Sequence, residues 1–390
     1  MKVVDKNNKV TLVAVGDIGF RIEENNDTFD GIRPILKDAD INLGQLEALL
    51  SGRGSRQVHF PGFEWSDMTG PSGWRPNPEA AVKVLVNNHF DIMSFASNHT
   101  MDMGDEALFD TLDILKKNDI ALIGAGRNIE EARRPAILER KGTKVGFLAY
   151  CSVVTRGSEA TKTTAGVAPM RATTAYELVD WQPGFPPKVI TKANPEDLAD
   201  MIEDIKKLRT QVDVLVVSMH WGVHWIPDVI ANYQFEVGHA AIDAGADIII
   251  GQHPHIMKGI EVYKGKVIFF SLSNFSMRRP RDFKFKPVMA SGRYWVDRFG
   301  VRAEADPDCP RYPYDINSQK NILVKCDIAN KKIRRVAYLP LWMNKEAILM
   351  PVSQSDPRSD EHLSYMQWMC GSQRLDTKFS REGDEVVILT

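Results

Sequence analysis

The amino-acid sequence predicts an α/β protein built around a mostly parallel sheet that helices cover on both faces. The first observation is that strand-like and helix-like segments alternate through most of the chain, which is the order of repeated βα units. The second is that strand-like segments contain continuous apolar runs, such as residues 248–250. Such runs are typical of strands that are buried on both sides.

The elements at the start of the chain follow one another in a regular order. Residues 9–17 form an apolar strand that runs into a loop, and residues 38–45 form a second strand. Residues 77–90 have helical spacing with Pro and Glu at the start, and residues 91–99 return to a strand. This β-α-β order predicts neighbouring parallel strands.

The same alternation continues as far as residue 251. The later helix-like segments are residues 105–118, 194–211 and 231–245. The later strand-like segments are residues 120–126, 143–152, 212–219 and 246–251. Residues 321–343 differ, because two alternating strands flank an Asn-containing turn there, and we expect this pair to be antiparallel.

Two long segments fit neither pattern. Residues 51–77 are rich in Gly, Pro and Trp, and residues 276–318 are rich in Arg, Pro and Asp. Long loops inside a compact domain are usually functional, so we expect both segments to border the active site and to shape substrate choice. We expect one domain over residues 1–345 and a C-terminal extension over residues 346–390 that packs on it.

The composition is that of a globular protein without a nucleic-acid partner. The 390 residues are 43% hydrophobic and 26% charged with a formal net charge of -2, and no Lys/Arg-rich run provides a basic surface. The apolar run at residues 10–15 is too short for a signal sequence or a spanning helix. We therefore expect no membrane segment and a cytoplasmic location, and the oligomeric state is open. The four cysteines form no CxxC pair and are expected to be buried.

Metal-binding side chains follow five of the strand-like segments. They are Asp17, Glu47, Asn98 with His99, His220, and His253 with His255. The carboxyl ends of strands in an open α/β sheet meet at one edge, so we expect these side chains to share one crevice. Carboxylate, amide and imidazole ligands together suit a divalent metal such as Mn, Fe or Zn. Taken singly, each residue also fits a plainer role, as a hydrogen-bonded histidine or a turn-forming aspartate.

Six blocks of the sequence occur in order between about residues 10 and 275. They are VGDIGF, GQLEALLS, FASNHTMDMG, GAGRN, MHWGVHW and AIDAGADIIIGQHPHIMKGIEVYKGKVIFFSLSNF. Together they resemble the blocks of the CapA family, the poly-gamma-glutamate capsule synthesis proteins, whose fold is similar to that of calcineurin-like metallophosphoesterases. The resemblance implies a four-layer α/β/β/α sandwich with a metal-dependent, hydrolase-like site at the strand edges.

The metallophosphoesterase pattern also implies a role for each site residue. Asp17 would bind one metal ion, and Glu47 would bridge two ions. Asn98 and His220 would bind the second ion, and His253 and His255 would complete the pair, one on each ion. His99 would protonate the leaving group or hold a phosphate. Two-metal sites of this kind polarise the electrophile and supply a bound hydroxide.

The chain departs from that pattern at several positions. Gly19 stands where the pattern has a histidine ligand, so one metal site is a ligand short and the centre holds either one ion or two. His224 stands where the family has a glutamate, and it either replaces the missing ligand, contacts the substrate or faces solvent. Gln45 and Ser273 replace a family Asn and Gly.

Three further polar residues are candidates for the site. Asp102 either orients His99 or caps the helix that begins near Asp105. Asn128 is a candidate substrate ligand and equally a turn or helix cap. Arg75 would clamp an anionic group of the substrate or lie in a solvated loop.

The resemblance implies a metal-dependent hydrolase or transferase that acts on an anionic small molecule or a gamma-glutamyl-type amide in the synthesis of a capsule-like polymer. A phosphoesterase acting on a nucleotide or sugar phosphate is the first alternative, favoured by His99 beside Asn98. A non-catalytic partner in polymer synthesis is the second, favoured by the missing histidine at Gly19.

Overall fold

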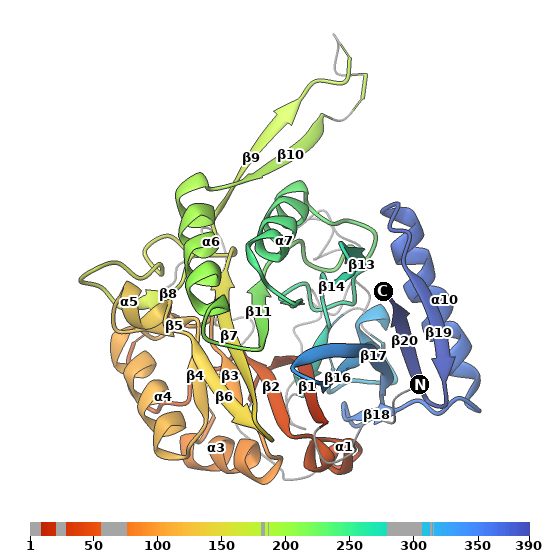
Figure 1. Ribbon diagram of the computed structural model, residues 1–390, viewed down its shortest axis with the longest axis horizontal. Helices are drawn as coiled ribbons and strands as arrows, with labels where there is room; N and C mark the ends of the chain where they lie inside the picture. The colour runs from red at the N-terminus through yellow and green to blue at the C-terminus, as the bar shows by residue number, and fades with distance from the viewer. Residues whose placement is uncertain are drawn as a thin grey trace.

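Two sheets pack face to face between two layers of helices in the computed structural model (Figure 1). The structure describes residues 9–20, 29–55, 76–180, 184–185, 187–278, 306–312, 314 and 316–390. This arrangement confirms the four-layer α/β/β/α sandwich.

The first sheet has ten strands and is parallel on one side and antiparallel on the other. Its main path runs through β19 (Lys378–Glu382), β20 (Glu385–Leu389), β17 (Lys332–Met343), β16 (Lys320–Ala329), β1 (Val10–Ile18), β2 (Ile41–Leu46), β3 (Ile92–Ser94) and β4 (Ala121–Ile123). Strands β1 to β4 are mutually parallel, whereas β16 and the strands beyond it are antiparallel. Two short strands, β15 (Asn274–Ser276) and β18 (Leu349–Pro351), pair with β1 and β17.

The second sheet has six strands and is parallel only in its centre. In spatial order they are β13 (Ile260–Tyr263), β14 (Lys266–Phe269), β12 (Ile248–Gln252), β11 (Val214–His220), β7 (Thr143–Cys151) and β6 (Ala136–Arg140). The edge strands β13 and β6 run antiparallel to their neighbours. The single, mostly parallel sheet predicted from the βα alternation is therefore wrong, because the βα units divide between two mixed sheets.

The four predicted helices begin and end close to the expected positions, as α3 (Pro78–Asn87), α4 (Asp105–Lys117), α6 (Pro195–Arg209) and α7 (Asn232–Ala244). Three further helices in the described part of the chain were not predicted: α1 (Arg33–Asp38), α5 (Ile129–Ala132) and α10 (Pro357–Ser372). The Asn-Pro pairs explain two of the starts, since Asn77 and Asn194 accept hydrogen bonds from backbone amides of the first turn while the proline occupies a position that needs no donor.

Continuous apolar runs arise because both faces of each central strand are covered. In β12, Ile248 and Ile250 point into the core between the two sheets, and Ile249 points into the core under α6 and α7. In β1, Leu12 belongs to the inter-sheet core and Val13 to the core under α3 and α4. All four cysteines are buried, as expected.

Three features lie outside the βα pattern. Strands β9 (Ala172–Glu177) and β10 (Lys188–Ala193) form a hairpin that projects from the body (Figure 1). Strand β5 (Ala125–Gly126) pairs with β8 (Gly166–Val167) in a small separate sheet. The predicted antiparallel pair at residues 321–343 is confirmed by β16 and β17, whose connection takes positive φ angles at Asn330 and Lys331.

The chain beyond residue 345 joins the first sheet. Strands β18 and β20 both pair with β17, and α10 inserts Met366, Met369 and Cys370 into the inter-sheet core. The division into a domain and an extension at residue 345 stays a prediction.

No helix in the described part of the chain is both long and apolar enough to cross a membrane.

Candidate metal centre

The first carboxylate of the site, Asp17, stands near the end of β1. The preceding Gly16 lets another backbone pass, since a Cβ there would lie 1.9 Å from the carbonyl oxygen of Ser273. This close approach places Asp17 N 3.1 Å from that same oxygen and Asn274 opposite Asp17 in the β1–β15 pair. A glycine at position 16 is therefore required for the local geometry.

The second carboxylate, Glu47, directly follows β2. Its amide donates to the carbonyl of Ile18 at 2.8 Å, and the parallel register sets Gln45 opposite Asp17. Asp17 and Glu47 are both buried, with 0% and 2% of their surface exposed. Two neighbouring parallel strands therefore deliver two buried carboxylates to one place.

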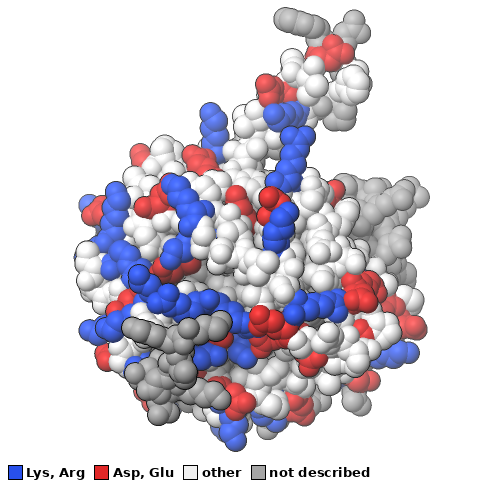
Figure 2. Space-filling view, turned by 45° about the vertical axis from the view of Figure 1, so that its right-hand side comes forward, with Lys and Arg blue, Asp and Glu red and all other residues white. Residues whose placement is uncertain are grey.

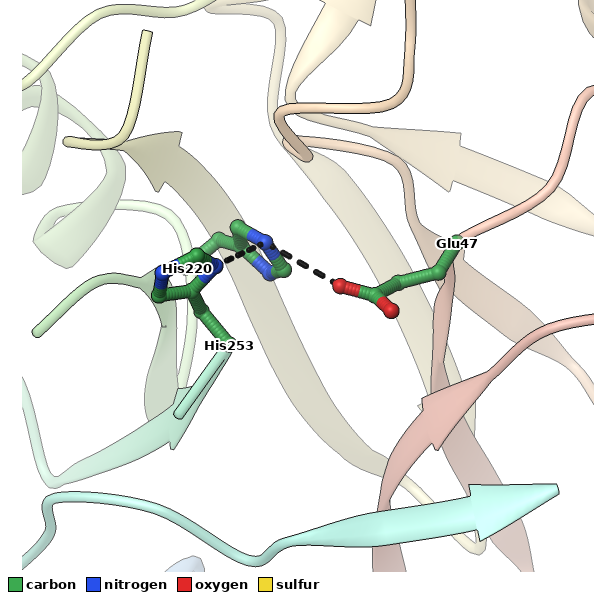
Figure 3. Close-up of side chains that lie close together, drawn as sticks. All are labelled: Glu47, His220 and His253. Atoms are coloured by element: carbon green, nitrogen blue, oxygen red, sulfur yellow. Dashed lines mark hydrogen bonds and ion pairs between the residues drawn. The ribbon is translucent and has the colours of Figure 1, made fainter. Parts of the chain in front are cut away.

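His220 comes from the other sheet and links the two. It is the last residue of β11 and is completely buried. Its Nε2 lies 2.7 Å from Asn98 Oδ1, 3.2 Å from Glu47 Oε1 and 3.2 Å from His253 Nδ1. Figure 3 shows Glu47 and His253 on opposite sides of the His220 ring.

His253 and His255 follow β12 in an unusual backbone conformation. Their φ angles are 95° and 54°, a region that non-glycine residues rarely adopt and that is concentrated at functional sites. The His253 amide donates to Asp17 Oδ2 at 3.2 Å. His255 Nδ1 lies 3.5 Å from Asp17 Oδ2, and its Nε2 lies 3.8 Å from Glu47 Oε2.

These side chains form two groups with metal-ligand geometry. Glu47, His220 and His253 make one group, and Asp17, Glu47 and His255 make the other, with ligand atoms within 4.8 Å of one another in each. Glu47 belongs to both groups, which is the placement expected of a bridging carboxylate. The structure thus brings together the residues expected to converge, while their roles as ligands stay a prediction.

The electrostatics of the site fit a divalent cation. Burial lowers the pKa of His220 and of His253, and neighbouring histidines lower both further, so both rings are neutral, as metal ligands must be. Burial raises the pKa of the Asp17 carboxyl well above its usual range. Asp17 Oδ1 has no hydrogen-bond partner within the part of the chain that the structure describes. A cation would stabilise the charged carboxylate at this position.

The departure at Gly19 has a structural counterpart. A Cβ at this position would lie 2.5 Å from Met277 Sδ, so the Met277 side chain occupies the space that a larger residue would need. A histidine could stand there only if Met277 moved away.

His224 packs on the predicted ligands through its ring face. Its ring centroid lies 3.9 Å from that of His253, 5.2 Å from that of His255 and 4.5 Å from that of Trp225. This placement contradicts the alternative in which His224 faces solvent. An imidazole binds metal in the plane of its ring, and a stacked ring supports its neighbours from the side, so we infer that His224 positions the two histidines.

His99 and Asp102 form a pair beside the candidate ligands. Asp102 Oδ2 lies 2.8 Å from His99 Nδ1, which is the contact expected if Asp102 orients His99, and the catalytic role of the pair stays a prediction. The alternative role of Asp102 as a helix cap is wrong, because the residue before α4 is Gly104 and no side chain caps this helix.

Asn128 and Arg75 are the two other residues that were predicted to bind substrate. Asn128 caps α5 by accepting a hydrogen bond from the amide of Glu131 at 3.0 Å, which confirms its interpretation as a helix cap. A contact between Asn128 and substrate stays a prediction. Arg75 lies outside the described residues.

The sequence analysis missed the residues that hold His255. His255 Nδ1 lies 2.7 Å from Asn274 Oδ1, and Asn274 Nδ2 donates to the Tyr312 hydroxyl. The ring of Tyr314 also lies 5.1 Å from that of His255. Asn274 follows the strand-like run of the longest sequence block, and this position could have indicated its role. The tyrosines belong to the segment 276–318, whose described part thus reaches the site as expected.

Comparisons with known sequences identify the family. The model of the bacterial capsule synthesis protein PGA_cap matches residues 11–278. The chain is 35% identical to the PGA biosynthesis protein CapA of Bacillus subtilis over 253 residues, which are 63% of this chain and 56% of that protein. It is 29% identical to the capsule biosynthesis protein CapA of Bacillus anthracis over 281 residues, which are 69% of this chain and 60% of that protein. The chain spans somewhat more than half the length of these relatives.

Two solved structures align with the chain at low sequence identity. A hypothetical protein from Thermus thermophilus aligns at 11% identity with a TM-score of 0.44, over 85% of this chain and 98% of that one. The calcineurin-like phosphoesterase YfkN from Bacillus subtilis aligns at 12% identity with a TM-score of 0.38, over 94% of this chain and 99% of that one. The family match alone covers well over half of the sequence, including every residue of the candidate metal centre. The chain therefore belongs to the family of the bacterial capsule synthesis protein PGA_cap.

Proposed function

We propose that the chain is a metal-dependent hydrolase or transferase that acts on a gamma-glutamyl-type amide, or on another anionic small molecule, in the synthesis of a capsule-like polymer. The observation that carries this proposal is the pair of buried ligand groups that share Glu47. The names of the curated relatives, which refer to PGA and capsule biosynthesis, support the polymer context. The cytoplasmic location and the absence of a nucleic-acid partner remain predictions.

Each side chain has a proposed task around the metal. Asp17 and His255 would hold one ion, His220, His253 and Asn98 would hold the other, and Glu47 would contribute to both groups. A divalent ion held there would polarise the substrate carbonyl or phosphoryl group and supply a nucleophilic water. The site suits Mn, Fe or Zn because it combines imidazole with oxygen ligands.

The proposed proton donor is His99. Asp102 holds the His99 ring through Nδ1 at 2.8 Å, so proton transfer to the leaving group takes place at Nε2.

Two measurements test the proposal. Elemental analysis of protein purified without chelator should find a divalent metal near stoichiometric amount. A panel of gamma-glutamyl amides and aryl phosphates, assayed with added Mn²⁺, should show turnover of the amides that a chelator abolishes. Protein without metal would remove the basis of the proposal, and turnover of the aryl phosphates alone would replace it with the phosphoesterase alternative.

Specific observations favour the two alternatives. A phosphoesterase acting on a nucleotide or sugar phosphate is favoured by His99 beside Asn98, since a histidine there would protonate an alkoxide leaving group. A non-catalytic partner in polymer synthesis is favoured by Met277, which occupies the space beside Gly19 where the metallophosphoesterase pattern has a ligand. Metal without turnover in the panel assay would support the second alternative.

A further inference from the structure

A cavity of about 680 Å³ lies among three loops that follow strands of the two sheets. Gly54 and Ser55 come from the loop after β2. The loop after β3 contributes Met101, Met103 and Gly104, and the first turn of α4 contributes Asp105 and Glu106. Residues 155–158 come from the loop after β7. This volume is in the range of small-molecule binding sites.

Two of these strand ends, those of β2 and β3, also carry residues of the candidate metal centre, and the third loop lies beside it. Glu47 follows β2, and Asn98 and His99 follow β3. The loop after β7 begins beside His220, because the Ser152 amide donates to the His220 carbonyl at 2.9 Å. The first and second loops touch, since a Cβ on Gly54 would lie 2.2 Å from the carbonyl oxygen of Met103. The cavity therefore opens at the edge of the sheets where the proposed chemistry takes place.

The lining of the cavity carries charges of both signs. Glu106 lies 3.6 Å from Arg53, which also binds Asp110. The negative charge of Glu106 is therefore compensated by this arginine. Asp105 and Arg156 also line the cavity, and both are exposed. Over the ranges that the structure covers, neither of these two side chains has an ion-pair or hydrogen-bond partner. One carboxylate and one guanidinium thus remain available to a ligand.

We propose that this cavity binds the zwitterionic α-amino-acid head group at the amino end of a gamma-glutamyl oligomer. The inference rests on the proposed function and names the part of the substrate that its site would recognise. Arg156 pairs with the α-carboxylate through its planar guanidinium, and Asp105 pairs with the α-ammonium group. Met101 and Met103 provide apolar surface for the methylene groups of the glutamyl side chain.

The charges of the lining argue against a phosphate ester as the occupant. A phosphate carries up to two negative charges and no positive one, so it would pair with Arg156 but would be repelled by Asp105. A head group that carries both an ammonium and a carboxylate can pair with Asp105 through the first and with Arg156 through the second. The volume leaves room for more than one glutamyl unit, so we expect an oligomer to bind more tightly than free glutamate.

Calorimetric binding to the metal-loaded protein tests the assignment without relying on turnover. The probes are di-gamma-glutamate, its N-acetyl derivative, the analogue in which the first α-carboxylate is an amide, and free glutamate. The wild-type protein should bind di-gamma-glutamate more tightly than the other three. Arg156→Gln should weaken binding of di-gamma-glutamate about tenfold or more and leave the amide analogue unaffected. Asp105→Asn should weaken it similarly and leave the N-acetyl derivative unaffected.

Two matched controls separate recognition from general changes of charge. Arg134→Gln removes an exposed arginine that lines a different cavity, and Asp119→Asn removes an exposed carboxylate just beyond the other end of α4. Both controls should bind di-gamma-glutamate like the wild type, and thermal unfolding should be unchanged in all four variants.

The outcomes distinguish this inference from the proposed function. Selective losses in the Arg156 and Asp105 variants would support the inference even if no turnover were found, which would then indicate a binding partner rather than an enzyme. No binding of di-gamma-glutamate by the wild type, or equal losses for all probes, would overturn it even if metal-dependent turnover of another substrate were confirmed.

Discussion

His99 and His253 have different proposed roles, and they lie in different environments. His253 contacts His220 and Asp17, inside the buried ligand groups, whereas His99 is held by Asp102 and belongs to neither group. A ligand and a proton donor respond differently when they are removed, so substitution at these two residues separates the roles.

His253→Ala should lose metal and activity together, because few ligands remain to hold the ion. His99→Ala should retain the metal and lower turnover about 10²–10⁴-fold. The loss in the His99 variant should shrink for a substrate with a good leaving group, since such a group departs without a proton. Metal content and rates on a good and a poor leaving group provide the measurement. Loss of metal from the His99 variant, or full activity of the His253 variant, would reverse the two roles.

At the scale of elements, the site depends on how closely β1 approaches the chain that leads into β15. The contact between Gly16 and Ser273 leaves no space for a side chain, and it sets Asp17 opposite Asn274, the residue that holds His255. The pairing of these two strands therefore positions Asp17 and His255, which belong to the same ligand group.

Gly16→Ala should destabilise the protein by about 1–3 kcal/mol or more, because the new methyl group forces the two backbones apart. Metal affinity should fall with it, since Asp17 and His255 would shift relative to one another. Gly371→Ala in α10 is the control, as a Cβ there meets nothing within 4 Å, and it should be neutral or slightly stabilising. Denaturant titration and metal titration of both variants provide the test, and an unchanged metal affinity in Gly16→Ala would contradict the argument.

The C-terminal helix α10 contains a buried histidine that is expected to make stability pH-dependent. His362 Nε2 lies 2.9 Å from the carbonyl oxygen of Asn321, and burial lowers the pKa of this residue to about 4. The unfolded chain takes up a proton near its ordinary pKa of about 6.5. The stabilising effect of the neutral ring is therefore complete above about pH 6.5 and is lost as the pH falls toward 4.

Between pH 7 and pH 5, this residue should lower the free energy of unfolding by about 2 kcal/mol. His362→Gln keeps a hydrogen-bond donor but cannot titrate, so its stability should fall less over the same interval. Urea denaturation of both proteins at the two pH values measures the difference. Parallel curves would show that His362 contributes nothing to the pH dependence.

At the scale of the whole molecule, the candidate metal centre lies between the two sheets and draws its residues from both. Asp17 and Glu47 belong to the first sheet, whereas His220, His253 and His255 lie at the strand ends of the second. Figure 2 shows acidic and basic side chains interspersed over one face of the molecule. The charged side chains on this face therefore do not form a surface of one sign.

Metal removal should lower the stability of the whole sandwich. A ligand present at 100 times its dissociation constant stabilises the folded state by about 2.7 kcal/mol, so chelation should lower the melting temperature of the wild type. The His253→Ala variant should show little change on chelation, and Asp102→Asn should respond like the wild type. A melting temperature that chelator leaves unchanged in the wild type would contradict a bound metal.

The sequence by itself predicted the order of the main βα units and which residues stand at the strand ends, but not α1, α5, α10 or the β9–β10 hairpin. Helical spacing, Asn-Pro starts and apolar runs are local patterns of the sequence. The polar residues that end the apolar runs, such as Asp17 and His220, can be identified from the same patterns. The family blocks added the four layers and the shared role of Glu47.

The tertiary structure alone decided which strands pair and what surrounds each site residue. The division into two mixed sheets, the packing of Met277 beside Gly19 and the contact of Asn274 with His255 join residues that are distant in the sequence. Local patterns record whether a strand is buried but not which strand lies next to it, because pairing depends on the packing of the whole chain. The ends of the strands were therefore predictable, and the arrangement of the side chains between the sheets was not.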